Sequence, residues 1–155
     1  MEFHNQYKKF IVKEQRIARS QIEPHNIYRI SVYKYTKGST ENIRETLFFS
    51  TGILKLENKL YGLKLTDITP EHFFIWAKRV VKYPELLEND EELINFSELL
   101  PTMDIGGKRL YESHLKNSKF LKSYKRTPFR SYNLDGIKYV SKVFINKNIL
   151  KDYYG

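Results

Sequence analysis

The sequence predicts an α+β fold: a small antiparallel barrel of 3+2 strands, a helical insertion and a flanking N-terminal helix. Three observations lead to this. Residues 27–66 alternate with period two in three runs that turn residues separate. Residues 69–125 carry helix caps and helical spacing. Residues 128–145 return to the strand pattern. The length of 155 residues fits a single domain, 1–155.

A helix is expected over residues 1–24, at the periphery of the domain. Apolar residues recur there at spacings of three, four and seven, which places them on one helical face. They are Phe3, Tyr7, Phe10, Ile11, Ile17 and Ala18. Pro24 ends the segment.

Residues 27–66 are expected to form a three-stranded antiparallel meander. β-branched and aromatic residues dominate the runs, and Gly52 marks a bulge or bend in the second one. Turn chemistry separates the runs at 37–42 and at 57–59. The strands are expected at 27–36, at 43–51 continued by 54–56, and at 60–66.

The helical insertion is expected over 69–125. Thr69-Pro70-Glu71 is a typical helix start, with an N-cap, a proline at the first position and an acid near the positive end of the dipole. Pro84 ends this helix. An acidic helix over 90–100, a joint at Gly106-Gly107 and a basic helix over 108–122 are expected to follow.

Residues 128–145 are expected to form a two-stranded hairpin, because Asp135-Gly136 separates two strand-like runs. Joined to the meander, this hairpin favours an SH3-like barrel, since closure removes exposed edges. An open α+β sheet with the helices on one face is the alternative, and the order of the elements does not separate the two.

Charge is distributed unevenly along the chain, which carries a formal net charge of +9. Residues 71–104 are acidic, whereas 106–130 contain eight Lys and Arg and one acid, Glu112. Such a segment attracts polyanions because neutralised phosphates release counterions. A solvated surface or a contact with an acidic protein is the other interpretation. Opposite charges on 85–104 and 106–130 suit either head-to-tail assembly into a homo-oligomer or neutralisation within one copy.

The candidate binding segment interleaves rings with cations, as surfaces that stack unpaired bases and hold phosphates do. Strand tyrosines such as Tyr33 and Tyr35 would extend this base-stacking surface across the sheet. The competing interpretation is that the rings pack the barrel and the cations are solvated. The candidate residues are Lys116, Lys119, Lys122, Tyr124, Lys125, Arg126, Arg130 and Tyr132.

No catalytic, metal or cofactor site is predicted. The chain has no cysteine, and its four histidines lack metal-ligand spacing. Glu57-Asn58-Lys59 matches half of a magnesium nuclease motif, but no Asp precedes it. Gly106-Gly107-Lys108 lacks the remaining residues of a phosphate loop. No apolar run approaches the ~18 residues of a membrane helix, and no signal peptide is evident.

About half of the chain resembles small tailed-bacteriophage proteins that are themselves similar to SH3-like barrel virion or DNA-associated proteins. The resemblance lies in Leu60-x-Gly62-Leu63-x-Leu65-x-x-Ile68-Thr69-Pro70-x-x-Phe73, in Tyr124-Lys125-Arg126, and in Tyr132-x-x-Asp135-Gly136-Ile137-x-x-Val140. It implies a phage setting and a non-enzymatic role.

We therefore expect a phage virion or accessory protein, in the virion or the host cytoplasm, that contacts nucleic acid, an acidic protein surface or other virion subunits. A general single- or double-stranded nucleic-acid binder in the host cytoplasm is the alternative. A small metal-dependent nuclease is the third hypothesis.

Overall fold

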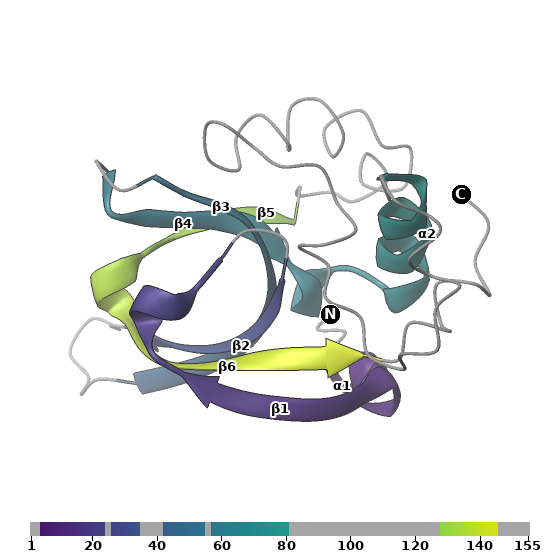
Figure 1. Cartoon of the computed structure of the whole chain (residues 1–155), viewed down its shortest axis with the longest axis horizontal. Helices are drawn as coiled ribbons and strands as arrows, with labels where there is room; N and C mark the ends of the chain where they lie inside the picture. Colours follow the sequence, from purple (N-terminus) through teal and green to yellow (C-terminus); the bar gives the residue numbers. More distant parts are fainter. Residues whose placement is uncertain (1–3, 24–25, 35–41, 55–56, 81–127, 146–155) are drawn as a thin grey trace.

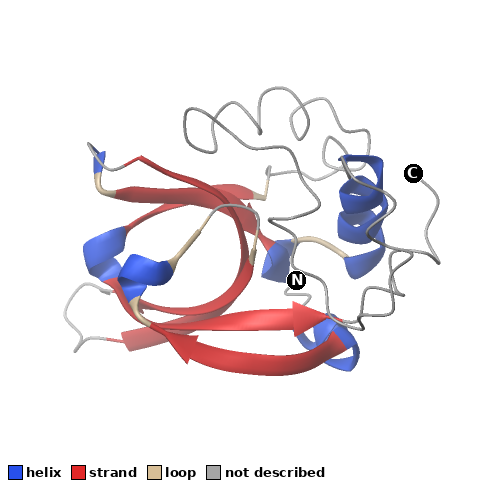
Figure 2. Cartoon of the chain, viewed as in Figure 1, coloured by secondary structure: helices blue, strands red, loops and turns tan. Residues whose placement is uncertain are grey.

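The computed structural model describes residues 4–23, 26–34, 42–54, 57–80 and 128–145. This part of the chain is a six-stranded antiparallel sheet with little helix, in the order β1-β6-β2-β3-β4-β5 (Figures 1 and 2). The strands are β1 Ile11–Ile17, β2 Ile27–Lys34, β3 Asn42–Leu54, β4 Lys59–Lys64, β5 Phe129–Asn133 and β6 Ile137–Ile145. The α-helices are α1 His4–Tyr7 and α2 Pro70–Val80. The 3-10 turns are η1 Lys8–Phe10, η2 Arg19–Gln21, η4 Leu65–Asp67 and η7 Leu134–Gly136.

The strands β2, β3 and β4 coincide with the three runs expected for the meander, and each pairs antiparallel with the next. The register between β3 and β4 shifts between Ser50 and Gly52, which is the bulge expected at the glycine. Asn58 has a φ of 54° in the turn before β4, a left-handed conformation that asparagine adopts more readily than most residues. Local turn chemistry therefore sets these strand boundaries.

The sheet curls around an inner core to which all six strands contribute (Figure 1). Tyr28, Ile30, Phe48, Leu60 and Val140 are almost completely buried in it. Ile17 of β1 and Tyr132 of β5, on the two outermost strands, pack against the same cluster. The curvature thus brings the first and last strands of the sheet to one interior.

A second core lies on the other face of β3, where Phe49 points away from its neighbour Phe48. Successive side chains of a strand point to opposite faces. Both phenylalanines are nevertheless fully buried, so each face of β3 has a core of its own here. The ring of Phe49 contacts Phe73 of α2 at 5.3 Å between centroids, and Tyr7 of α1 contacts Phe74 at 6.2 Å. The sheet is therefore covered on both faces at this end.

The helix α2 begins where the sequence predicted a start. The backbone N–H of His72 donates to the Thr69 hydroxyl at 3.3 Å, as an N-cap requires. Pro70 is the first helical residue, and the buried Phe73 and Phe74 form the face that packs against the sheet.

The helix expected over 1–24 is wrong for the described residues. One short helix and one 3-10 turn end at Phe10, and residues 11–17 form strand β1, which pairs with β6. The spacing of Tyr7 and Phe10 does place both rings against Phe74. Residues 11–17 instead form backbone hydrogen bonds with the edge of β6. This tertiary pairing overrides the helical spacing of their apolar residues.

The hairpin expected over 128–145 is also corrected, because its two strands do not pair with each other. β5 pairs with β4, and β6 pairs with β2 and β1. Residues 134–136 form η7 rather than a two-residue turn. Leu134 packs against the inner core, and its N–H donates to the Asn58 carbonyl at 2.9 Å. These contacts carry the chain across the end of the curled sheet instead of folding it back.

The predicted fold class holds at the level of an antiparallel sheet that curls around a core. The sheet has one strand more than the 3+2 arrangement, and among the described residues β1 and β5 are its two unjoined ends. Of the helical insertion, the described part is α2, and residues 81–127 lie outside the described ranges. None of the described helices is long and apolar enough to cross a membrane.

Candidate functional site

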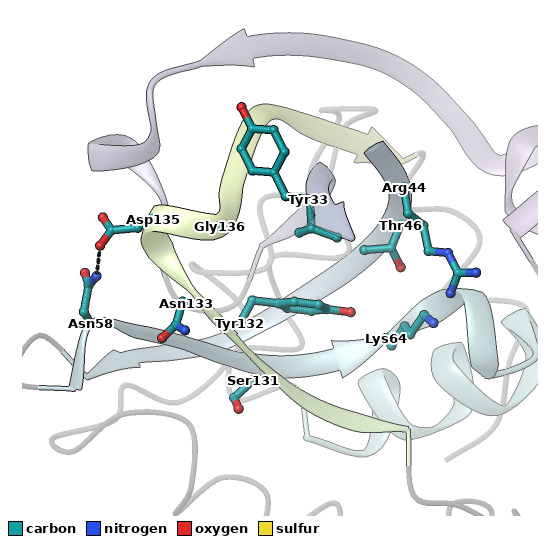
Figure 3. Close-up of a pocket in the computed structure, with 11 residues that line it drawn as sticks. Tyr33, Arg44, Thr46, Asn58, Lys64, Ser131, Tyr132, Asn133, Asp135 and Gly136 are labelled. Carbon is teal, nitrogen blue, oxygen red and sulfur yellow. Dashed lines mark hydrogen bonds between the residues drawn. The ribbon is translucent and has the colours of Figure 1, made fainter. Parts of the chain in front are cut away.

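A cavity of about 790 Å³ opens between β2, β3, β4, β5 and η7 (Figure 3). Arg44 and Lys64 lie at one end, Asn58 and Asp135 at the other, and Tyr132 lies between them. The volume falls within the usual range of small-ligand sites, ~300–1,000 Å³. The cavity is therefore large enough for a ligand of nucleotide size.

At the end of the cavity that Arg44 and Lys64 line, positively charged side chains outnumber the negatively charged ones nearby. The Lys64 ammonium lies 3.7 Å from the Asp67 carboxylate, and the Arg130 guanidinium lies 3.6 Å from the same oxygen. Arg44 is exposed, and no ion pair joins it to a carboxylate among the described residues. Two cations thus share one acid, and Arg44 adds a further positive charge near Tyr132, which favours an anion at this end.

The hydroxyl of Tyr132 lies among these charges. Burial raises its pKa above the ordinary value of 10.0, nearby Arg130 and Arg44 act in the opposite direction, and Asp67 adds to the increase. A hydrogen bond with Thr46 also lowers the pKa, but burial outweighs it. The phenol is consequently protonated at neutral pH and is a hydrogen-bond donor inside the cavity.

The opposite end of the cavity presents oxygen acceptors. The side-chain amide of Asn58 donates to Asp135 at 3.0 Å, which leaves the amide oxygen and one carboxylate oxygen for a ligand. The turn before β4 and η7 bring these residues together over a separation of 77 positions in the chain. This end is suited to groups that donate hydrogen bonds.

A basic aromatic surface adjoins the cavity. It consists of Arg16, Tyr33, Lys138 and Tyr139 from β1, β2 and β6, and we call it the cation–ring surface. Arg16 lies 4.5 Å from the centroid of Tyr139, and Lys138 lies 5.3 Å from Tyr139 and 5.7 Å from Tyr33. Tyr33 also lines the cavity, so the surface and the cavity share an edge.

Of the eight candidate binding residues, two lie within the described ranges, and the structure places both on β5. Tyr33, which was expected to extend the stacking surface, is also described and lies on the cation–ring surface. Arg130 is in the ion pair with Asp67. Tyr132 lines the cavity, and its ring also packs against Phe48 at 5.3 Å. The competing interpretation, that this ring packs in the fold, is therefore observed, and the same ring also borders the cavity. Lys116, Lys119, Lys122, Tyr124, Lys125 and Arg126 lie outside the described residues, as does Tyr35.

Sequence reasoning missed Arg44, Lys64 and Asp67 at the cavity, and Arg16, Lys138 and Tyr139 on the neighbouring surface. Each is an ordinary polar or aromatic residue in its local pattern. The pairing of β4 with both β3 and β5 assembles the cavity, and the pairing of β6 with β1 and β2 assembles the surface. The alternating pattern of the strands was visible in the sequence, but the partner of each strand was not.

Glu57 and Asn58 of the motif considered for a nuclease form side-chain hydrogen bonds within the fold. The Tyr61 hydroxyl donates to the Glu57 carboxylate at 2.6 Å, and this hydrogen bond raises the pKa of Tyr61. In the described ranges, no three acidic or histidine side chains group closely enough to hold a metal ion.

No protein-family model, curated protein or solved structure matches this chain.

Proposed function

We propose that the protein is a non-enzymatic nucleic-acid-binding module, a phage virion or accessory protein, that binds single strands on its cation–ring surface. The observation that carries the proposal is the alternation of two cations and two rings within 4.5–5.7 Å across β1, β6 and β2. Bases stack on tyrosine rings, and the adjacent cations hold phosphates. Tyr139 is 45% exposed, so a base could reach its ring if the side chains of Arg16 and Lys138 move aside to hold the phosphates.

The fold that we propose for this module is an SH3-like barrel with one added strand. Strands β2 to β6 form a unit in which the last strand returns to pair with the first, and a 3-10 turn joins the last two. The shared inner core supports this assignment, because it draws on every strand. β1 is then an addition at the outer edge of β6.

The basic segment that contains Lys116, Lys119, Lys122, Tyr124, Lys125 and Arg126 is proposed to contribute to the same polyanion contact. Its charge and that of the cation–ring surface have the same sign. A contact with an acidic subunit of the virion would use the same residue types, and the experiment below tests for that outcome.

Fluorescence anisotropy with a labelled oligothymidine tests the proposal. The wild-type chain is expected to bind, and Tyr139→Ala to weaken binding by about tenfold, since stacking contributes ~1–3 kcal/mol per base. Arg16→Gln is expected to weaken binding as well. Lys9→Gln is the matched control, because it removes one exposed cation at the opposite end of β1.

Absence of binding at low salt would contradict nucleic-acid recognition. If the same sample had a mass well above that of one chain, the charged surfaces would be assigned to subunit contacts. Equal affinity of Tyr139→Ala and the wild type would place binding elsewhere on the chain.

A further inference from the structure

The cavity beside the cation–ring surface has a division of chemistry that the surface lacks. Cations lie at one end, hydrogen-bond acceptors at the other, and an aromatic ring between them (Figure 3). A nucleotide is complementary to this arrangement, because its phosphate suits the cations, its planar base suits the ring, and the polar edge of the base suits the acceptors.

We propose that this cavity binds a nucleoside monophosphate, either free or as the phosphorylated end of a strand. The inference extends the proposed function, because it assigns a separate pocket for one nucleotide next to the surface that binds the strand.

The phosphate would lie at Arg44 and Lys64. Asp67 already neutralises part of the charge of Lys64 and Arg130, at 3.7 Å and 3.6 Å, and it also holds these two side chains in place. Arg44 makes no ion pair within the described ranges and offers a planar guanidinium for two parallel hydrogen bonds. The protonated hydroxyl of Tyr132 adds a neutral donor to the same end.

The base would lie along Tyr132, with its polar edge at Asn58 and Asp135. The ring of Tyr132 lies across the cavity in Figure 3, and its packing on Phe48 and its hydrogen bond with Thr46 fix its orientation. The remaining oxygens of Asn58 and Asp135 accept hydrogen bonds, so a base with an amino group fits better than one with a carbonyl in its place.

Calorimetric titration with dCMP and dUMP tests this assignment, since the two differ in having an amino group or a carbonyl oxygen at one position of the base. dCMP is expected to bind, and dUMP to bind several-fold more weakly. Arg44→Gln is expected to weaken dCMP binding by about tenfold or more, because it removes a charge-assisted hydrogen bond. Arg44 is exposed, and an unchanged thermal unfolding midpoint verifies that the variant folds.

The variant Arg16→Gln separates this inference from the proposed function. It is expected to bind dCMP like the wild type while binding oligothymidine more weakly. If dCMP binds but oligothymidine does not, the pocket stands and the proposed function fails. If oligothymidine binds but dCMP does not bind at millimolar concentration, the pocket is overturned and the surface stands.

Two further results would overturn the pocket: an unchanged affinity of Arg44→Gln for dCMP, or equal binding of dCMP and dUMP. A comparison of 5′-phosphorylated and 5′-hydroxyl oligonucleotides distinguishes the two sources of the nucleotide. Tighter binding of the phosphorylated strand, lost in Arg44→Gln, assigns the pocket to a strand end. Equal binding of both strands assigns it to free nucleotides.

Discussion

Gly62 of β4 pairs with Ser50 of β3, and its missing side chain leaves room for the Phe48 ring of the inner core. A Cβ at this position would lie 2.8 Å from Cε1 and Cζ of the Phe48 ring and would also collide with the backbone carbonyl oxygen of Phe49. The Phe48 ring has no room to move, because it is fully buried against Tyr132. The glycine is thus required by packing between two paired strands.

Gly62→Ala is therefore expected to lower the free energy of unfolding by about 1–3 kcal/mol, as overpacking in a rigid core does. Gly136→Ala is the matched control, because nothing lies within 4 Å of the added methyl group. Its effect is expected within about 0.5 kcal/mol. Urea denaturation of both variants checks the difference, and equal stabilities would contradict the close approach of the strands.

Two tyrosines that pack in the inner core, Tyr28 and Tyr132, make the free energy of unfolding sensitive to pH in the alkaline range. Burial is the main reason that the pKa values of Tyr28 and Tyr132 are raised above 10.0. The folded state then holds these protons at a pH at which the unfolded chain releases them. Their contribution is complete below the unfolded pKa of about 10 and is lost as the pH rises through the folded pKa.

The free energy of unfolding is accordingly expected to fall above pH 10, and to fall less steeply in Tyr132→Phe. Denaturant titrations at pH 8 and at several values above pH 10 give the slope of the unfolding free energy against pH for the wild type and for the variant. The phenylalanine keeps the ring contact with Phe48 and removes the ionisable group. Identical slopes for the variant and the wild type would show that Tyr132 does not titrate differently in the two states.

Among the elements, the N-terminal segment shows why helical spacing misled. Tyr7 and Phe10 do face one partner, and Tyr7 also donates a hydrogen bond from its hydroxyl to the Ile68 carbonyl at 3.0 Å. Spacing over one turn is correct here, but it does not extend to residues 11–17, which pair with β6. By contrast, α2 was predicted from a cap, which is a local signal that tertiary pairing did not override.

Replacing Tyr7 tests how firmly α1 is attached to the rest of the fold. Tyr7→Phe is expected to cost about 0.5–1.5 kcal/mol, the usual value of one hydrogen bond. Tyr7→Ala is expected to cost about 3–5 kcal/mol, because it also removes the ring that packs on Phe73 and Phe74. Thermal or urea unfolding provides both values. If the two variants were equally stable, the ring packing would contribute nothing.

At the scale of the whole molecule, charge is distributed unevenly along the chain. The formal net charge is +9, although residues 71–104 are acidic. The cation–ring surface adds positive side chains from β1 and β6, which are far apart in sequence and adjacent in the sheet. The net charge favours long-range attraction of a polyanion, whereas the specific contacts that we propose would depend on the surface.

The salt dependence of oligothymidine binding separates these two contributions. On single strands, the logarithm of affinity falls with the logarithm of salt by about 0.7 per phosphate neutralised. Lys138→Gln is expected to reduce that slope by about 0.7, and Lys9→Gln to leave it unchanged. Equal slopes for all three proteins would mean that Lys138 neutralises no phosphate.

The sequence by itself determined the local features: the alternation of β2, β3 and β4, the bulge at Gly52, the turn at Asn58 and the cap at Thr69. These depend on a few neighbouring residues, so the local pattern contains the information. Only the tertiary structure decided that residues 11–17 are a strand, that β5 and β6 are not a hairpin, and that Arg44, Lys64 and Tyr132 share a cavity. A strand's own sequence specifies its faces but not its partners, because backbone hydrogen bonding is the same for every residue that can donate and accept.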